Sequence, residues 1–153
     1  MKHTLKPLLF LLPVAAMIGC SKSNNSNPSK ASSIVGKWNY SSDTVKFYNN
    51  GTLDQTLANQ GLNAGDYIQF NADGSGLDVQ SGGTTTFTYT NSNGKLTMNA
   101  PAQTIGGQPE PASTEVATIK TLTSTDLFLY FDDTEVNSGV TSETVESTHF
   151  KKQ

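Results

Sequence analysis

Apolar and polar residues alternate along most of this chain, starting at Ile34 and continuing almost to its last residue. One face of the first such stretch carries Ile34, Gly36, Trp38 and Tyr40, and the other carries Val35, Lys37 and Asn39. A period of two places successive side chains on opposite faces of an extended strand, so the pattern predicts half-buried β-strands. The same alternation occurs in Val45/Phe47, Ile68/Phe70, Leu77/Val79, Phe87/Tyr89, Leu96/Met98 and Leu127/Leu129/Phe131. The fold is therefore predicted to be all-β.

Tight-turn dipeptides separate four of these segments. Asp73-Gly74, Gly82-Gly83 and Asn93-Gly94 each supply the positive φ angles that a short hairpin needs. We therefore expect a continuous antiparallel up-and-down meander, with strands at 66–71, 75–80, 84–90 and 95–99.

The rest of the domain adds further strands. Segments 115–122 and 126–132 form another hairpin, and a last strand at 142–151 follows the acidic loop 132–135. With strands at 33–40 and 44–48, which can also be one bent strand, the total is about eight or nine. A meander of this size removes its exposed edges by closing into a barrel, and an open sandwich is the alternative.

Two stretches lack the strand alternation. Residues 49–65 carry Leu53, Leu57 and Leu62 among Asn, Gln and Gly, which predicts an irregular segment with room for a short helix. Residues 100–113 contain three prolines and a Gly-Gly pair, which predicts a loop outside the sheet.

The first residues have the pattern of an export signal. Lys2 and Lys6 precede an apolar run over residues 8–18 that is too short to span a bilayer, and Gly19 precedes Cys20, the only cysteine. This arrangement resembles the lipobox of bacterial lipoproteins. The resemblance implies removal of a signal peptide (1–19) and attachment of a diacylglyceryl group, with acyl chains such as palmitate, to Cys20. An ordinary secretory signal is the alternative.

The lipid anchor has consequences for location and domain organisation. Two or more acyl chains hold a protein stably on a bilayer, and Ser21 after the cysteine favours the outer membrane in Gram-negative sorting. Which leaflet of that membrane the protein occupies stays open. Residues 20–33 are rich in Ser, Asn and Lys and predict a flexible tether. Residues 34–153 then form one domain of ordinary size.

Charge excludes one class of partner. The chain has 13 acidic residues against 10 lysines and no arginine, which gives a formal net charge of −3. Proteins that bind nucleic acid contact phosphates mainly through Arg and Lys, so we expect no nucleic-acid partner.

Three phrases in the domain resemble those of lipocalin-like proteins. Gly36-Lys37-Trp38 resembles the Gly-x-Trp signature at the start of the first lipocalin strand. The phrases 70–76 and 122–127 resemble a hairpin and the approach to a late strand in small bacterial lipocalin-like lipoproteins. The resemblance implies structural roles for Gly36 and Trp38, with Trp38 plugging the closed end of the barrel. In lipocalins an arginine lies across that ring, and here Lys151 or Lys152 would have to replace it.

The sequence suggests no catalytic or metal site. His149 is the only histidine after residue 20, whereas a Ser-His-Asp triad or a zinc site needs a histidine beside other specific groups. The loop that starts at Asn71 has Gly82 where an EF-hand needs its glutamate, so a hairpin turn is the better interpretation. We expect no enzyme activity, no cofactor and no metal. Thr44 lies in a short phrase that resembles a bacterial O-glycosylation signal, and its modification is left open.

The barrel interior carries the functional hypothesis. Eight strands enclose a space that side chains fill or that holds one small ligand. The candidate lining residues are Phe47, Phe70, Phe87, Tyr89, Met98, Leu129 and Phe131, with Leu53, Leu57 and Leu62 as candidate lid residues. The first hypothesis is a membrane-anchored, non-catalytic protein that binds a small apolar ligand. The alternative is a structural module with a filled core that docks an envelope protein.

Overall fold

The computed structural model describes residues 32–59 and 61–153, and the described part of the chain is all-β. Its strands are β1 (Gly36–Asn49), β2 (Thr52–Ala58), β3 (Tyr67–Phe70), β4 (Ser75–Gln80), β5 (Gly83–Ser92), β6 (Lys95–Ala100), β7 (Gln103–Ile105), β8 (Gln108–Glu110), β9 (Ser113–Leu122), β10 (Asp126–Asn137) and β11 (Val140–Lys152). Across the described ranges, no helix is long and apolar enough to cross a membrane. The expected signal peptide 1–19, Cys20 and most of the tether 20–33 lie outside the described residues.

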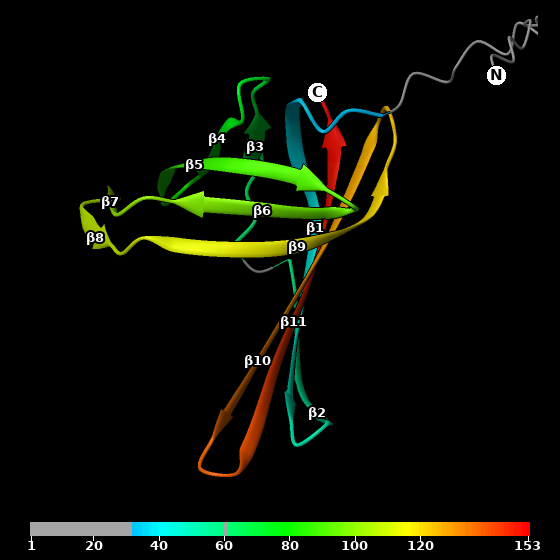
Figure 1. Cartoon of the computed structure of the whole chain (residues 1–153), viewed down its shortest axis with the longest axis vertical. Helices are drawn as coiled ribbons and strands as arrows, with labels where there is room; N and C mark the ends of the chain where they lie inside the picture. The colour runs from blue at the N-terminus through cyan, green and yellow to red at the C-terminus, as the bar shows by residue number, and fades with distance from the viewer. Residues whose placement is uncertain (1–31, 60) are drawn as a thin grey trace, which may run out of the picture. The chain divides into compact units, whose positions relative to one another are not determined.

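Eight strands close into an antiparallel barrel with up-and-down connections (Figure 1). Around the ring the order is β1, β3, β4, β5, β6, β9, β10 and β11, and β11 pairs again with β1. That closing pair runs from Trp38 opposite Lys152 to Asn49 opposite Ser142. The predicted barrel is therefore confirmed, and the open sandwich is wrong.

The predicted meander is present in β3, β4, β5 and β6. Asn93 and Gly94 have φ angles of 52° and 73° and join Ser92 to its partner Lys95. Two consecutive positive φ angles match the right-handed twist of the flanking strands, which is why the Asn-Gly pair forms this turn.

The structure differs from the sequence prediction in the segment after β1 and at the C-terminal end of β10. β1 is one strand with a bulge between Tyr40 and Ser42, as the sequence allowed, whereas β2 occupies most of the stretch predicted as irregular or helical. β10 continues through the predicted acidic loop 132–135 to a turn at Ser138-Gly139. Asn50-Gly51, with φ angles of 49° and 76°, turns β1 into β2. That Asn-Gly signal is visible in the sequence.

These extensions continue the barrel sheet beyond the ring, in a part that we call the arm (residues 43–58 and 132–146). In the arm β2 pairs with β1, β1 with β11, and β11 with β10. Figure 1 shows these four strands running past the barrel and ending in two hairpin tips.

Residues 100–113, predicted as a loop, contain the small hairpin β7–β8. Gly106 and Gly107, with φ angles of 57° and 85°, make its turn, and Pro109 lies opposite Thr104. Proline is accommodated because a two-stranded hairpin leaves it on an edge, where its missing N–H costs no ladder bond.

Trp38 lies at the base of the barrel with none of its surface exposed. Its indole N–H donates to the Ile34 carbonyl oxygen at 2.7 Å, and the Lys152 ammonium lies 4.4 Å from the ring centroid. The expected lysine cation–π contact is therefore made by Lys152. A Cβ on Gly36 would lie 2.7 Å from Lys152 Cε, so the glycine leaves room for this lysine.

Candidate ligand cavity

The barrel contains a partly open cavity of about 750 Å³, which every barrel strand helps to line. Ligand sites for small molecules commonly have volumes of about 300–1,000 Å³. The barrel therefore has room for a small molecule beside its packed cluster of buried side chains, which includes Trp38, Phe70 and Leu96.

One part of the cavity wall is apolar. Buried side chains from five strands contribute to it: Ile68, Phe87, Met98, Leu129 and Phe150. The Phe150 ring also packs against the ring of Tyr40, with the two centroids 4.6 Å apart. This surface suits a ligand with a hydrocarbon or aromatic part.

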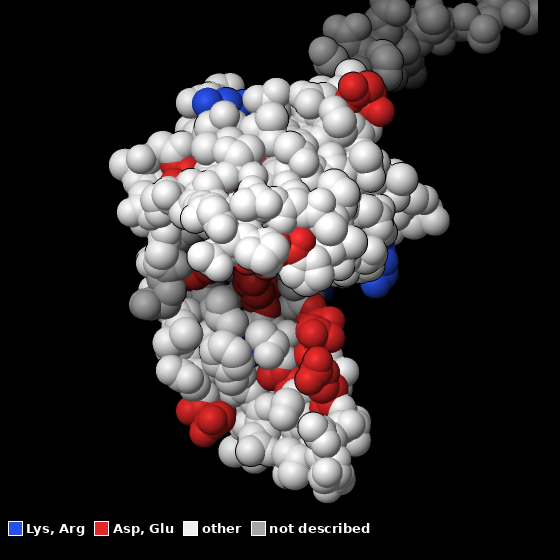
Figure 2. Space-filling model, turned by 90° about the vertical axis from the view of Figure 1, so that its left-hand side faces the viewer, with Lys and Arg blue, Asp and Glu red and all other residues white. Residues whose placement is uncertain are grey.

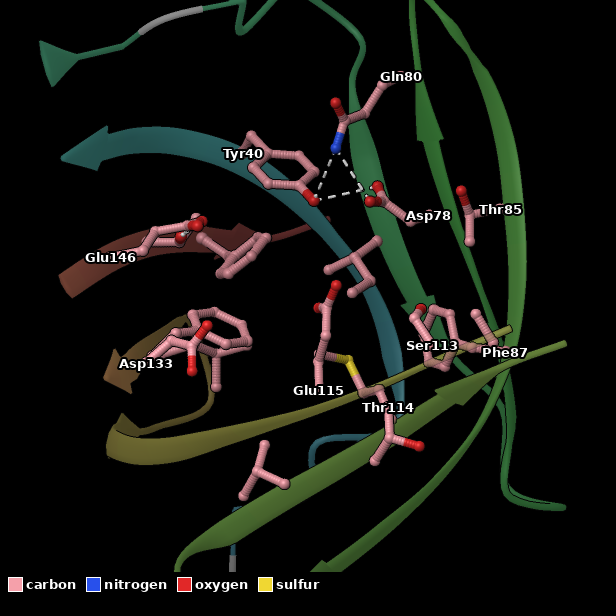
Figure 3. A pocket seen from close by; sticks show the side chains of 18 of the residues that line it. Tyr40, Asp78, Gln80, Thr85, Phe87, Ser113, Thr114, Glu115, Asp133 and Glu146 are labelled. Atoms are coloured by element: carbon pink, nitrogen blue, oxygen red, sulfur yellow. Dashed lines mark hydrogen bonds between the residues drawn. The ribbon is translucent and has the colours of Figure 1, made fainter. Parts of the chain in front are cut away.

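A hydrogen-bonded group of three side chains forms another part of the wall (Figure 3). The Tyr40 hydroxyl donates to Asp78 Oδ1 at 3.0 Å. The Gln80 amide donates to Asp78 Oδ2 at 2.9 Å and to the Tyr40 oxygen at 3.2 Å. Burial raises the pKa of Asp78 to about 6, although these hydrogen bonds act in the opposite direction. Burial and the neighbouring Asp78 charge raise the pKa of Tyr40, which keeps its hydroxyl a donor.

Acidic side chains face the cavity from both sides of the ring. Asp78 comes from β4, whereas Glu115, Asp133 and Glu146 come from β9, β10 and β11. Figure 3 shows Glu115 below the Tyr40–Asp78 pair, with Glu146 and Asp133 on the left of the view. Figure 2 shows acidic side chains gathered in the hollow where the barrel meets the arm.

Glu146 lies inside the cavity and accepts a hydrogen bond from Thr148 Oγ1 at 2.9 Å. Its pKa is raised, first by burial and then by the nearby Asp43 and Glu115 carboxylates. Glu115 and Asp133 are exposed, so they stand nearer the opening. The interior thus combines two partly buried carboxylates with two that reach solvent.

The seven candidate lining residues lie in three different places. Phe87, Met98, Leu129 and Phe131 line the cavity. Phe70 and Tyr89 are not among the lining residues but pack edge-on with each other and with Phe87, and the Tyr89 hydroxyl donates to the Asn71 carbonyl at 2.7 Å. Phe47 lies on the arm part of β1, opposite Gln55 and Thr144.

The three candidate lid residues do not line the cavity. Leu53 and Leu57 belong to β2 in the arm, and Leu62 follows in the connection to β3. Leu53 is half exposed and pairs with Tyr48, while Leu57 pairs with Val45. None of the three is among the cavity-lining residues.

Sequence reasoning missed the carboxylates, because it looked only for an apolar or aromatic lining. The alternation at Leu77 and Val79 marks one face of β4, and Asp78 on the other face lines the cavity. Gly76, two residues earlier, is buried opposite Phe87. Gly76 was the sequence signal that could have placed Asp78 inside. It lies on the same face of β4 as Asp78, and a glycine on the inner face leaves room for a large neighbouring ring.

His149 lies away from the cavity lining and takes part in an ion-pair group. Its Nε2 is 2.8 Å from Asp126 Oδ1, and Lys151 contacts the same carboxylate oxygen. Lys151, Thr125 and His149 hold the pKa of Asp126 well below its usual range. Within the described ranges, no three His, Cys, Asp or Glu residues are grouped so that they could hold a metal ion.

The comparison with protein families identifies the fold. A family model described as a lipocalin-like domain matches residues 34–129. The chain belongs to the lipocalin-like domain family. The matched segment runs from the base, at Ile34, into β10, and β11 then closes the lipocalin-like barrel. No curated protein and no solved structure gives a significant match to the chain.

Proposed function

We propose that this lipocalin-like protein is a membrane-anchored, non-catalytic binding protein that holds one small organic ligand inside its barrel. The observation that carries the proposal is the cavity of about 750 Å³ at the centre of the fold. A barrel built only for stability would gain by filling that space, because interiors are normally close-packed and empty volume costs contact energy.

The apolar wall supports a ligand with an apolar part. Phe87, Leu129 and Phe150 present ring and methyl surface to the cavity, and burying such surface gains about 25 cal/mol per Å². The polar group at Tyr40 and Asp78 offers directional contacts beside it. This mixture of a large apolar surface and a few polar groups is typical of small-molecule sites.

Anchoring is supported by the resemblance of the first 20 residues to a lipoprotein signal. With Cys20 lipidated, the segment 20–33 would tether the barrel to the outer membrane, in either leaflet. Such a tether keeps a binding domain at the membrane surface while leaving its cavity accessible.

Native mass spectrometry of the full chain, extracted from its own membranes, tests the binding function. We expect a non-covalent mass addition in wild type and its loss in Ala100→Trp, because Ala100 lines the cavity and an indole there would occupy it. Ala102→Trp is the matched control, since Ala102 is exposed and outside the cavity lining. An addition that persists in Ala100→Trp, or none in wild type, would contradict the proposal.

A docking role is the second candidate, favoured by apolar side chains on the arm. Leu53, Val136 and Val140 are 50%, 72% and 41% exposed there. Replacing all three by serine should release a docked envelope protein in a cross-linking experiment while leaving the mass addition unchanged. If cross-linked partners are the same in wild type and variant, the arm is not the docking surface.

A further inference from the structure

The charges around the cavity are of one sign. Asp78, Glu115, Asp133 and Glu146 line it together with Asp132, and none of the described lining residues is Lys, Arg or His. Four lysines of the described chain contact other groups: Lys37 lies over Tyr67, Lys120 over Tyr130, Lys152 over Trp38, and Lys151 pairs with Asp126. In the described part of the chain, the ion pairs formed by lysine or histidine involve Asp126 and none of the cavity carboxylates.

This arrangement is unfavourable in the empty barrel. A partly buried carboxylate loses hydration, and its cost is recovered only when a positive charge or several donors face it. Asp78 receives hydrogen bonds from Tyr40 and Gln80, and Glu146 receives one from Thr148. Burial is the main cause that raises the pKa of both carboxyls, and the nearby Glu115 charge raises both further.

The shape of the site indicates what kind of cation would fit. The carboxylates are spread around a large space, and no metal-holding group of three acidic or His/Cys side chains exists in the described ranges. A divalent metal ion needs several oxygen ligands within about 2.0–2.6 Å, which a spread set does not supply. An ammonium group, by contrast, needs one or two carboxylates and tolerates aromatic neighbours such as Tyr40 and Phe150.

We infer that the cavity selects small organic ammonium ions, with the charged nitrogen among the Asp78, Glu115 and Glu146 carboxylates and an apolar tail or ring against Phe87, Met98 and Leu129. The exposed Glu115 and Asp133 attract the cation toward the opening. The inference rests on the proposed binding function and adds the chemical class of the ligand. It also amends the sequence-based hypothesis of a purely apolar ligand.

Three probes with the same tail test this charge selection. Octylamine (cationic at neutral pH), octanol and octanoate are titrated into the purified full chain, and binding is measured by calorimetry at pH 7.5 and low salt. We expect octylamine to bind about tenfold more tightly than octanol, because one charge-assisted contact contributes about 1.5 kcal/mol. Octanoate should bind more weakly than either.

Two carboxylate variants assign the effect to the cavity. Asp78→Asn and Glu146→Gln should each weaken octylamine binding about tenfold and so remove its preference over octanol. Asp54→Asn, an exposed acid of β2, is the matched control and should change neither. A thermal melt of each variant checks that it is folded.

The outcomes separate this inference from the proposed function. Equal binding of octylamine and octanol, or no weakening in the Asp78 and Glu146 variants, overturns the charge selection while the cavity remains a binding site. Binding of Ca²⁺ with no binding of octylamine overturns it in favour of an inorganic ion. Failure of the Ala100→Trp experiment overturns the binding function itself.

Discussion

Asp78 makes the stability of the barrel depend on pH in a direction that is unusual for an aspartate. Burial against the cavity wall raises its pKa from 3.8 to about 6. Folding therefore favours the protonated carboxyl, and the favourable contribution is complete below pH 3.8 and lost as the pH rises through about 6. The free energy of unfolding should thus fall between about pH 4.5 and pH 7.5, whereas a salt-bridged aspartate would make it rise.

The magnitude follows from the size of the shift. About two pKa units correspond to about 3 kcal/mol between the two protonation states, at about 1.36 kcal/mol per unit. Asp78 is only partly buried and accepts hydrogen bonds from Tyr40 and Gln80, so solvent screening reduces the expected effect to about 1–2 kcal/mol. Asp78→Asn removes the charge and keeps an oxygen acceptor for Tyr40. It should stabilise the protein by about that amount at pH 7.5 and make little difference at pH 4.5.

Urea unfolding followed by Trp38 fluorescence measures this effect, because Trp38 is the only tryptophan and is fully buried. The pH range of 4.5–7.5 lies above the region where Asp126, whose pKa is lowered, loses its favourable contribution on acidification. Asp54→Asn is the control for loss of one negative charge. A residual slope in Asp78→Asn is expected from Glu146, whose pKa is also raised. If wild type and Asp78→Asn show the same pH dependence, Asp78 is solvated and the reasoning is refuted.

Three further substitutions test the base, the wall and the anchor. Trp38→Ala should lower the free energy of unfolding by about 3–5 kcal/mol, the range for deleting a large buried aromatic side chain. Circular dichroism melts measure this loss, and an unchanged melting curve would refute the role of Trp38 as the plug. Gly76→Ala should cost about 1–3 kcal/mol, because the new methyl group would overlap the Phe87 ring and lie 2.8 Å from the Gln69 oxygen. An equally stable Gly76→Ala would mean that the ring moves freely. Cys20→Ser should abolish incorporation of labelled palmitate, and label retained in that variant would exclude the lipoprotein hypothesis.

The sequence by itself determined the class of fold and many of its local features. Alternation with a period of two and the turn at Asn93-Gly94 were sufficient for the meander, because strand faces and positive φ angles are local properties of the chain. The contact at the base of the barrel could also be predicted. The Gly-x-Trp phrase and the lack of arginine indicated that a C-terminal lysine would contact Trp38.

Only the tertiary structure decided which faces look inward and where each strand ends. Period-two alternation predicts that a strand has two faces but not which of them faces the interior. The inward position of Asp78, between Leu77 and Val79, could therefore not be predicted from the alternation. The arm likewise depends on β11, which pairs with β1 on one side and β10 on the other and so extends both beyond the ring. Pairing between segments about 100 residues apart is set by barrel closure and by packing around the cavity. Neighbouring residues therefore cannot specify the acidic lining that brings together β4, β9, β10 and β11.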